Sequence, residues 1–185
     1  MMLPSGWVAY DTSEKTEQDL LAQARARLMP QHQVALQGML EAHVARAMQA
    51  ARDNGAILTI MPGSETPDAL FATASMIATV REATEQYSLD DVVVDIIQRR
   101  GGQSLDENKR IVRWTEAGKA QISGEDVGAY SVFYLTPVPG SSRRRALQFA
   151  LTVAHPPEID IETDEVLAGW VALVDAHVAT FRWSA

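Results

Sequence analysis

A chain of 185 residues can bury about 70% of its unfolded surface, and its 46% hydrophobic and 22% charged residues exclude a disordered or fibrous class. Its 24 acidic and 16 basic residues leave a net charge of −8, which argues against nucleic-acid binding because phosphates are neutralised by clustered lysine and arginine. The chain has no cysteine, so disulfides, thiolate nucleophiles and cysteine-ligated metals are excluded.

The sequence favours neither a membrane nor a secretory destination. Residues 1–10 lack the basic and apolar regions of a signal peptide, and no apolar run approaches the roughly 18 residues of a membrane-spanning helix. No linker, repeat or low-complexity tract divides the chain. We therefore expect a cytoplasmic protein that folds as one α+β domain over residues 1–185.

The first third is predicted to hold a short strand followed by two helices. Residues 3–10 are typical of a turn that leads into a strand, and Thr12 or Ser13 can cap the helix that follows. Pro30 is expected to interrupt this helix. A second helix over residues 31–54 places apolar residues on one face and ends at Asn54 and Gly55.

Residues 56–80 are predicted to form two strands. The first, over residues 56–61, is compact and apolar. Residues 69–80 fit two structures, because their alanines would also suit a helix that begins at Thr66-Pro67-Asp68. We predict a strand because apolar residues alternate with Thr73, Ser75 and Thr79.

One helix and two short strands are predicted next. Ser88 begins a helix that runs to about Arg100 and carries a capping-box pattern at its start, with acidic residues in its first turn. Residues 111–114 and 118–122 are typical of two short strands that lead into a long hairpin.

The last third is expected to organise the fold. Residues 126–155 predict an antiparallel hairpin with its turn at Pro137–Gly140, and a helix over residues 163–182 follows. On the second strand Leu147, Phe149, Leu151 and Val153 share one face. We expect the apolar stripe of the helix to lie on that face, and we assign the stripe to Val166, Trp170, Leu173, Val174, His177, Val178 and Phe181. The predicted architecture is an antiparallel β-sheet of six to seven strands packed against long amphipathic helices.

Few residues are candidates for a ligand site. His43 and His177 lie on the apolar stripes of two predicted helices, but neither belongs to a metal-binding pair such as H-x-x-x-H, and we expect packed histidines and no metal site. With Tyr134 and Trp170 they could instead line a small-molecule pocket assembled from dispersed residues. We expect no cofactor, because the sequence has neither a phosphate loop nor a nucleophile elbow.

Two charged clusters have ordinary explanations. Arg143, Arg144 and Arg145 could contact an anionic partner, although a solvated turn that keeps the sheet end from aggregating explains them better. The acidic residues from Glu158 to Glu165 are not spaced as a calcium loop, and carboxylates just before a helix are explained by its dipole.

Several short segments carry a resemblance to a known family. They are the Pro4-x-Gly6-Trp7 start, the alanine-rich long helix, the hairpin around Pro137–Gly140 and the closing Phe181-Arg182-Trp183. Together they resemble a family of uncharacterised actinobacterial proteins that is similar in layout to the PsbP-like α+β fold. The resemblance implies an antiparallel sheet with helices on its faces and a role in binding proteins or assembling complexes. The helical insert over residues 16–54 departs from that layout.

Two classes of function remain open. The first is a non-catalytic interaction or assembly protein, favoured because no acid–base pair or nucleophile stands out and because sheet edges can accept a partner. Its partner would be another protein, and a homodimer is among the assemblies that it permits. The second is a small-ligand binding protein or an enzyme whose site is assembled in space.

Overall fold

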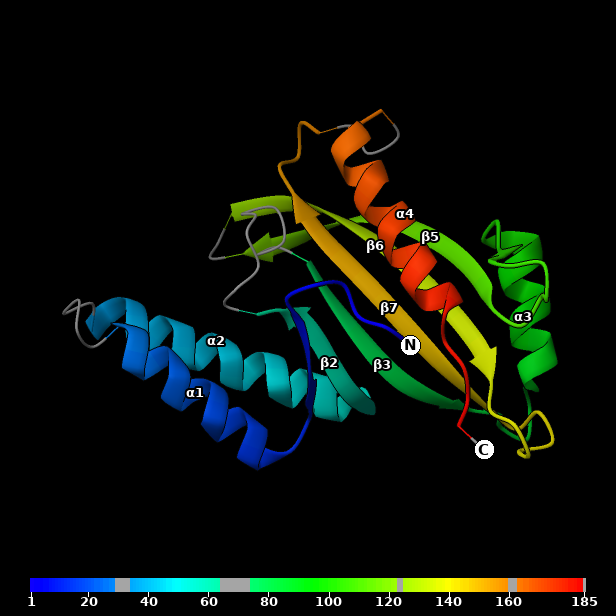
Figure 1. The fold of residues 1–185 in the computed structure, drawn as a ribbon, viewed down its shortest axis with the longest axis horizontal. Helices are drawn as coiled ribbons and strands as arrows, with labels where there is room; N and C mark the ends of the chain where they lie inside the picture. Colours follow the sequence, from blue (N-terminus) through cyan, green and yellow to red (C-terminus); the bar gives the residue numbers. More distant parts are fainter. Residues whose placement is uncertain (29–33, 64–73, 123–124, 160–162, 185) are drawn as a thin grey trace.

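The computed structural model describes residues 1–28, 34–63, 74–122, 125–159 and 163–184. Within these residues, seven strands form one sheet in which every neighbouring pair is antiparallel (Figure 1). Their order across the sheet is β1 (Trp7–Asp11), β2 (Ala56–Pro62), β3 (Ala74–Glu82), β7 (Arg145–His155), β6 (Glu125–Pro137), β5 (Val112–Ile122) and β4 (Gln103–Ser104). The predicted antiparallel α+β class is confirmed.

The described segments hold four helices beside the sheet, namely α1 (Glu14–Leu28), α2 (Val34–Asp53), α3 (Leu89–Arg99) and α4 (Glu165–Ala179). The expectation of long helices is not confirmed, because they span only 11 to 20 residues. Capping residues in the sequence set where α4 begins and where α3 ends. The side chain of Asp164 accepts a hydrogen bond from Leu167 N at 2.8 Å and so begins α4 at Glu165, and Gly101, at a φ of 67°, follows the end of α3.

The two faces of β7 contact different helices. Leu147, Phe149, Leu151 and Val153 are buried together with residues of α4 in the larger apolar cluster. Ala146, which points to the opposite face, is buried in a second cluster that contains residues of α3. The sheet therefore separates α4 from α3, and the predicted docking of the C-terminal helix on the Phe149 face is confirmed (Figure 1).

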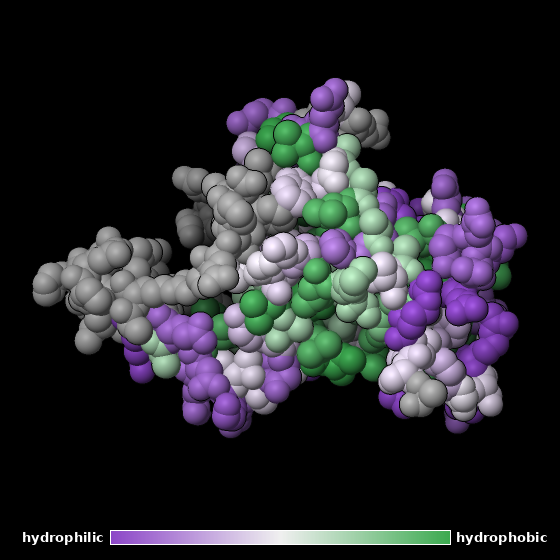
Figure 2. Space-filling view, viewed as in Figure 1, coloured by the Kyte–Doolittle hydropathy of each residue, from purple (hydrophilic) through white to green (hydrophobic). Residues whose placement is uncertain are grey.

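The contact stripe of α4 differs from the one predicted. The helix buries Leu167, Val171, Val174 and Val178, whereas Val166 and Leu173 are 53% and 39% exposed. Trp170 is only partly buried against the core. Because α4 is apolar around most of its circumference, spacing alone fitted more than one rotation. Figure 2 shows hydrophobic residues gathered over the middle of this side of the molecule.

The two short strands predicted over residues 111–122 are a single strand. β5 pairs continuously with β6 from Val112–Leu135 to Ile122–Glu125. The prediction of two strands was wrong because it broke β5 at Thr115–Ala117, where the partner strand continues and keeps these residues paired. The two-residue strand β4 was not predicted, since a segment that short carries no periodicity.

One further predicted strand and two predicted helix caps agree with the described residues. Residues 74–82 are a strand, with Met76 and Ala78 only 1% exposed, while residues 69–73 lie outside the described part of the chain, as does Pro30. Ser88 caps α3 through the predicted capping box with Asp91. Ser13 Oγ accepts a hydrogen bond from Thr16 N at the start of α1.

The phase of β7 gives the first testable prediction. Phe149→Ala should lower the free energy of unfolding by about 3–5 kcal/mol, because the ring is 4% exposed and its removal leaves a cavity under α4. Gln148→Ala, one residue away on the other face, should cost less than about 1 kcal/mol. Denaturant titration measures both. A larger cost for Gln148→Ala than for Phe149→Ala would contradict the face assignment.

Candidate functional site

The four residues proposed for a dispersed pocket lie on three elements. His43 belongs to α2, and its side chain lies outside the described part of the structure. Tyr134 is fully buried on β6, whereas Trp170 and His177 are half-buried on α4. The three cavities considered below are lined by other residues, so a pocket shared by these four stays a prediction.

Tyr134 takes part in a polar cluster that sequence analysis did not find. Its hydroxyl donates a hydrogen bond to Asp175 Oδ1 of α4 at 2.8 Å. Arg113 of β5 donates from Nε to both Asp175 oxygens, at 2.9 and 3.1 Å. The three residues therefore tie α4 to two neighbouring strands. No local signal could reveal this, because Arg113 and Asp175 are 62 residues apart in the sequence.

The cluster suits anchoring better than acid–base chemistry. Burial, and next the charge of Asp175, raises the pKa of Tyr134 far above its usual value near 10. A phenol in that state does not release its proton near neutral pH. The adjoining cavity of about 200 Å³ is lined mainly by apolar residues of α4, such as Leu167 and Val171, with Tyr130 and Asp175 at its polar side.

The arginine cluster lies in the turn between β6 and β7. Arg143 pairs with Asp90 of α3 at 2.7 Å, and the two side chains are 70% and 57% exposed. Arg145 pairs with Glu82 at 3.4 Å. These exposed ion pairs contribute little to stability, and they connect the turn to α3 and β3. Whether the cluster also contacts an anionic partner stays a prediction.

The largest of these three cavities lies between α3 and the sheet, and we call it the α3 groove. It has a volume of about 940 Å³. One wall is formed by residues of α3 between Leu89 and Arg99, and the other side by Arg81, Gln148, Phe133 and Trp114, which come from β3, β7, β6 and β5 in turn. The antiparallel register brings these four strands side by side. Val92 and Val94 of α3 line the groove and are 37% and 49% exposed.

The floor of the groove is aromatic and held in place. The rings of Trp114 and Phe133 stack with their centroids 4.9 Å apart and their planes 14° apart. Trp114 Nε1 donates a hydrogen bond to Glu116 at 3.1 Å, and Arg100 donates to the same carboxylate at 3.0 Å. Arg100 also pairs with Asp95 at 3.5 Å. This chain of polar contacts joins the end of α3 to β5 and keeps the groove in its observed shape.

The groove was only partly predictable. The helix that forms one wall was predicted with its cap, and a segment rich in aromatic and β-branched residues placed Phe133 on a strand. Nothing in the sequence showed that Trp114 stacks on Phe133, because their contact depends on the register of β5 against β6. The missed signal was the alternation of Val112, Trp114 and Glu116, which would have placed these side chains on one face.

Ligand-binding chemistry of other kinds has little support in the described residues. Among them, no three histidine, aspartate or glutamate side chains converge as a metal site.

No helix in the described part of the chain is both long enough and apolar enough to cross a bilayer. Comparison with known proteins found no matching family model, no matching curated protein and no matching solved structure.

The polar cluster of Tyr134, Arg113 and Asp175 predicts a loss of stability at high pH. The pKa of Tyr134 is higher in the folded state than in the unfolded state. The contribution of its hydroxyl to the free energy of unfolding is therefore complete below the unfolded-state pKa of about 10, and it is lost as the pH rises above that value. The free energy of unfolding should therefore fall above about pH 10, and it should fall less steeply in Tyr134→Phe. Alkaline titration of tyrosinate absorbance should also show that Tyr134→Phe lacks a tyrosine that ionises only on unfolding. An identical titration in both proteins would contradict the assignment.

Proposed function

We propose that this protein is a non-catalytic interaction protein that binds another protein in the α3 groove. The observation that carries the proposal is an open groove with a stacked aromatic floor beside a helix that leaves apolar side chains in contact with water. Binding surfaces of proteins commonly combine an apolar centre that contains aromatic residues with a polar rim. The layout resemblance to PsbP-like proteins, which act by binding other proteins, points to the same class of function.

The apolar part of the groove is suited to receive an apolar side chain of the partner. Val92 and Val94 are exposed on the wall, and Tyr87, which is 65% exposed, lines the same groove next to the start of α3. Exposed apolar residues scattered singly need no explanation, but here three of them line one concave surface. Covering them would remove apolar area from water, which favours association.

The charged part of the groove indicates the chemistry of the partner. Glu82, Asp91, Asp95 and Glu116 line the groove together with three arginines, so its rim presents both signs of charge. Arg99 is 81% exposed and its pair with Asp95, at 3.4 Å, is on the surface, which leaves Arg99 available to pair with a partner. We infer that the partner presents an apolar side chain flanked by residues of both charges.

The proposal predicts that one substitution on the groove wall weakens partner binding. Val94→Glu places a charge on an exposed helical position, so it should leave the thermal unfolding midpoint nearly unchanged while it weakens partner binding about tenfold or more. Proteins captured by the native chain should be identified by mass spectrometry, and each should then be purified and titrated by calorimetry against the native chain and the variant.

The matched control is Val166→Glu. It makes the same change at a helical valine that is 53% exposed, but on α4. A partner that binds the native chain and the Val166→Glu variant equally, and loses binding to Val94→Glu, supports docking in the groove. A partner that is lost with Val166→Glu and kept with Val94→Glu would overturn the proposal.

A further inference from the structure

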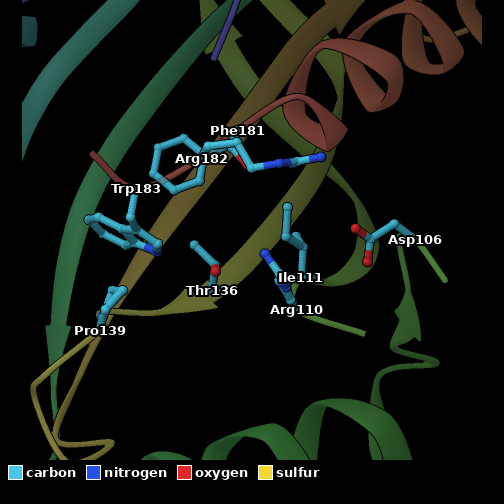
Figure 3. A pocket seen from close by; sticks show the side chains of 8 residues that line it. All are labelled: Asp106, Arg110, Ile111, Thr136, Pro139, Phe181, Arg182 and Trp183. Carbon is cyan, nitrogen blue, oxygen red and sulfur yellow. The ribbon is translucent and has the colours of Figure 1, made fainter. Parts of the chain in front are cut away.

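A second, smaller cavity lies on the other face of the sheet, and we call it the C-terminal pocket. Its volume is about 210 Å³, below that of pockets that take drug-sized ligands. It is formed by the loop after β4, the end of β6 and the segment that follows α4. Figure 3 shows Thr136 near its centre, with Trp183 and Pro139 to one side and Arg110, Ile111 and Asp106 to the other.

Two polar groups of the pocket have no hydrogen-bond partner among the described residues, and one of them is a fully buried atom. Thr136 is only 4% exposed, and no hydrogen bond joins its hydroxyl to another described residue, although it lines the pocket. Asp106 contributes a carboxylate whose Oδ1 is buried and accepts no hydrogen bond from the described residues. Buried polar groups are nearly always hydrogen-bonded, so the unpaired Asp106 oxygen indicates a site built for a ligand, and the Thr136 hydroxyl offers a second polar group on the pocket wall.

The pocket also holds two guanidinium groups with free donor positions. Arg182 donates from Nη1 to the carbonyls of Ala179 and Phe181, at 2.7 and 2.6 Å, which fixes the group at the pocket wall. Its remaining nitrogens make no hydrogen bond to a described residue. Arg110 lines the pocket and forms no ion pair with a described residue, Asp106 included. Guanidinium groups bind carboxylates with two parallel hydrogen bonds.

We propose that the C-terminal pocket binds a small zwitterion that carries a carboxylate and an ammonium group close together, which is the chemistry of a free α-amino acid. The carboxylate lies between Arg110 and Arg182 and accepts from the Thr136 hydroxyl, and the ammonium group compensates Asp106. A plain anion would leave Asp106 facing a like charge, and a plain cation would face two arginines. The apolar side chain of the amino acid packs on Phe181 and Trp183.

The first test compares ligands that differ by one charged group. The standard amino acids are titrated into the full chain at millimolar concentrations, and the indole NH signal of Trp183, assigned with Trp183→Phe, reports binding by NMR. L-leucine is the first probe, with 4-methylpentanoate lacking its ammonium group and isopentylamine lacking its carboxylate. We expect an apolar amino acid to bind and each of its two analogues to bind about tenfold more weakly or worse.

The second test assigns each group to its residue. Asp106→Asn should weaken L-leucine about tenfold and leave 4-methylpentanoate unchanged or tighter, whereas Arg110→Gln and Thr136→Val should weaken both. Arg46→Gln, at an exposed arginine of α2, is the control and should change neither. Thermal unfolding verifies that each variant is folded. The proposal is overturned if no amino acid shifts the Trp183 signal, if 4-methylpentanoate binds as tightly as L-leucine, or if Asp106→Asn has no effect.

Discussion

The fold depends on the pairing of β7 along both of its edges. One edge pairs with β3 from Ala74–Val153 to Glu82–Arg145, and the other pairs with β6 from Gly128–His155 to Pro137–Ala146. A shift of one residue in either register would turn the apolar face of a strand toward the wrong side of the sheet. Because Leu147 to Val153 alternate without interruption, only one phase buries them under α4. The strands that position both candidate sites are therefore placed by this one central strand.

A second constraint determines how α4 rests on the sheet. Apolar contact alone would permit several rotations, because the helix is apolar around most of its circumference. Asp175 removes this freedom, since only one rotation lets it accept from both Tyr134 and Arg113. Without this carboxylate, the half-buried guanidinium of Arg113 and the buried hydroxyl of Tyr134 would lose their partner. That loss would cost several kcal/mol, about as much as a well-packed apolar side chain contributes. The polar cluster thus explains why Leu173 is exposed while Val174 is buried.

The sheet keeps the two candidate sites apart. Trp114 and Phe133 of the α3 groove belong to the face that carries α3, whereas Thr136, opposite Leu147 in the register, belongs to the face that carries α4. The groove lies along α3, and the pocket forms where the end of β6 and the segment after α4 meet. A protein in the groove and a small molecule in the pocket would not compete for space, so the two proposals are independent.

The sequence alone was sufficient wherever a pattern repeats over neighbouring residues. Alternation identified β3 and β7, aromatic and β-branched residues identified β6, and the capping box located the start of α3. The apolar face of β7 was also assigned to the correct side. Each of these signals depends on residues close in the chain. The tertiary structure decided the rest. The continuity of β5 depended on its partner β6, and the rotation of α4 depended on an aspartate that meets an arginine 62 residues away. The groove likewise collects residues from four strands, and the pocket collects residues from three separate segments. Local spacing in the sequence cannot predict contacts between groups that only folding brings together.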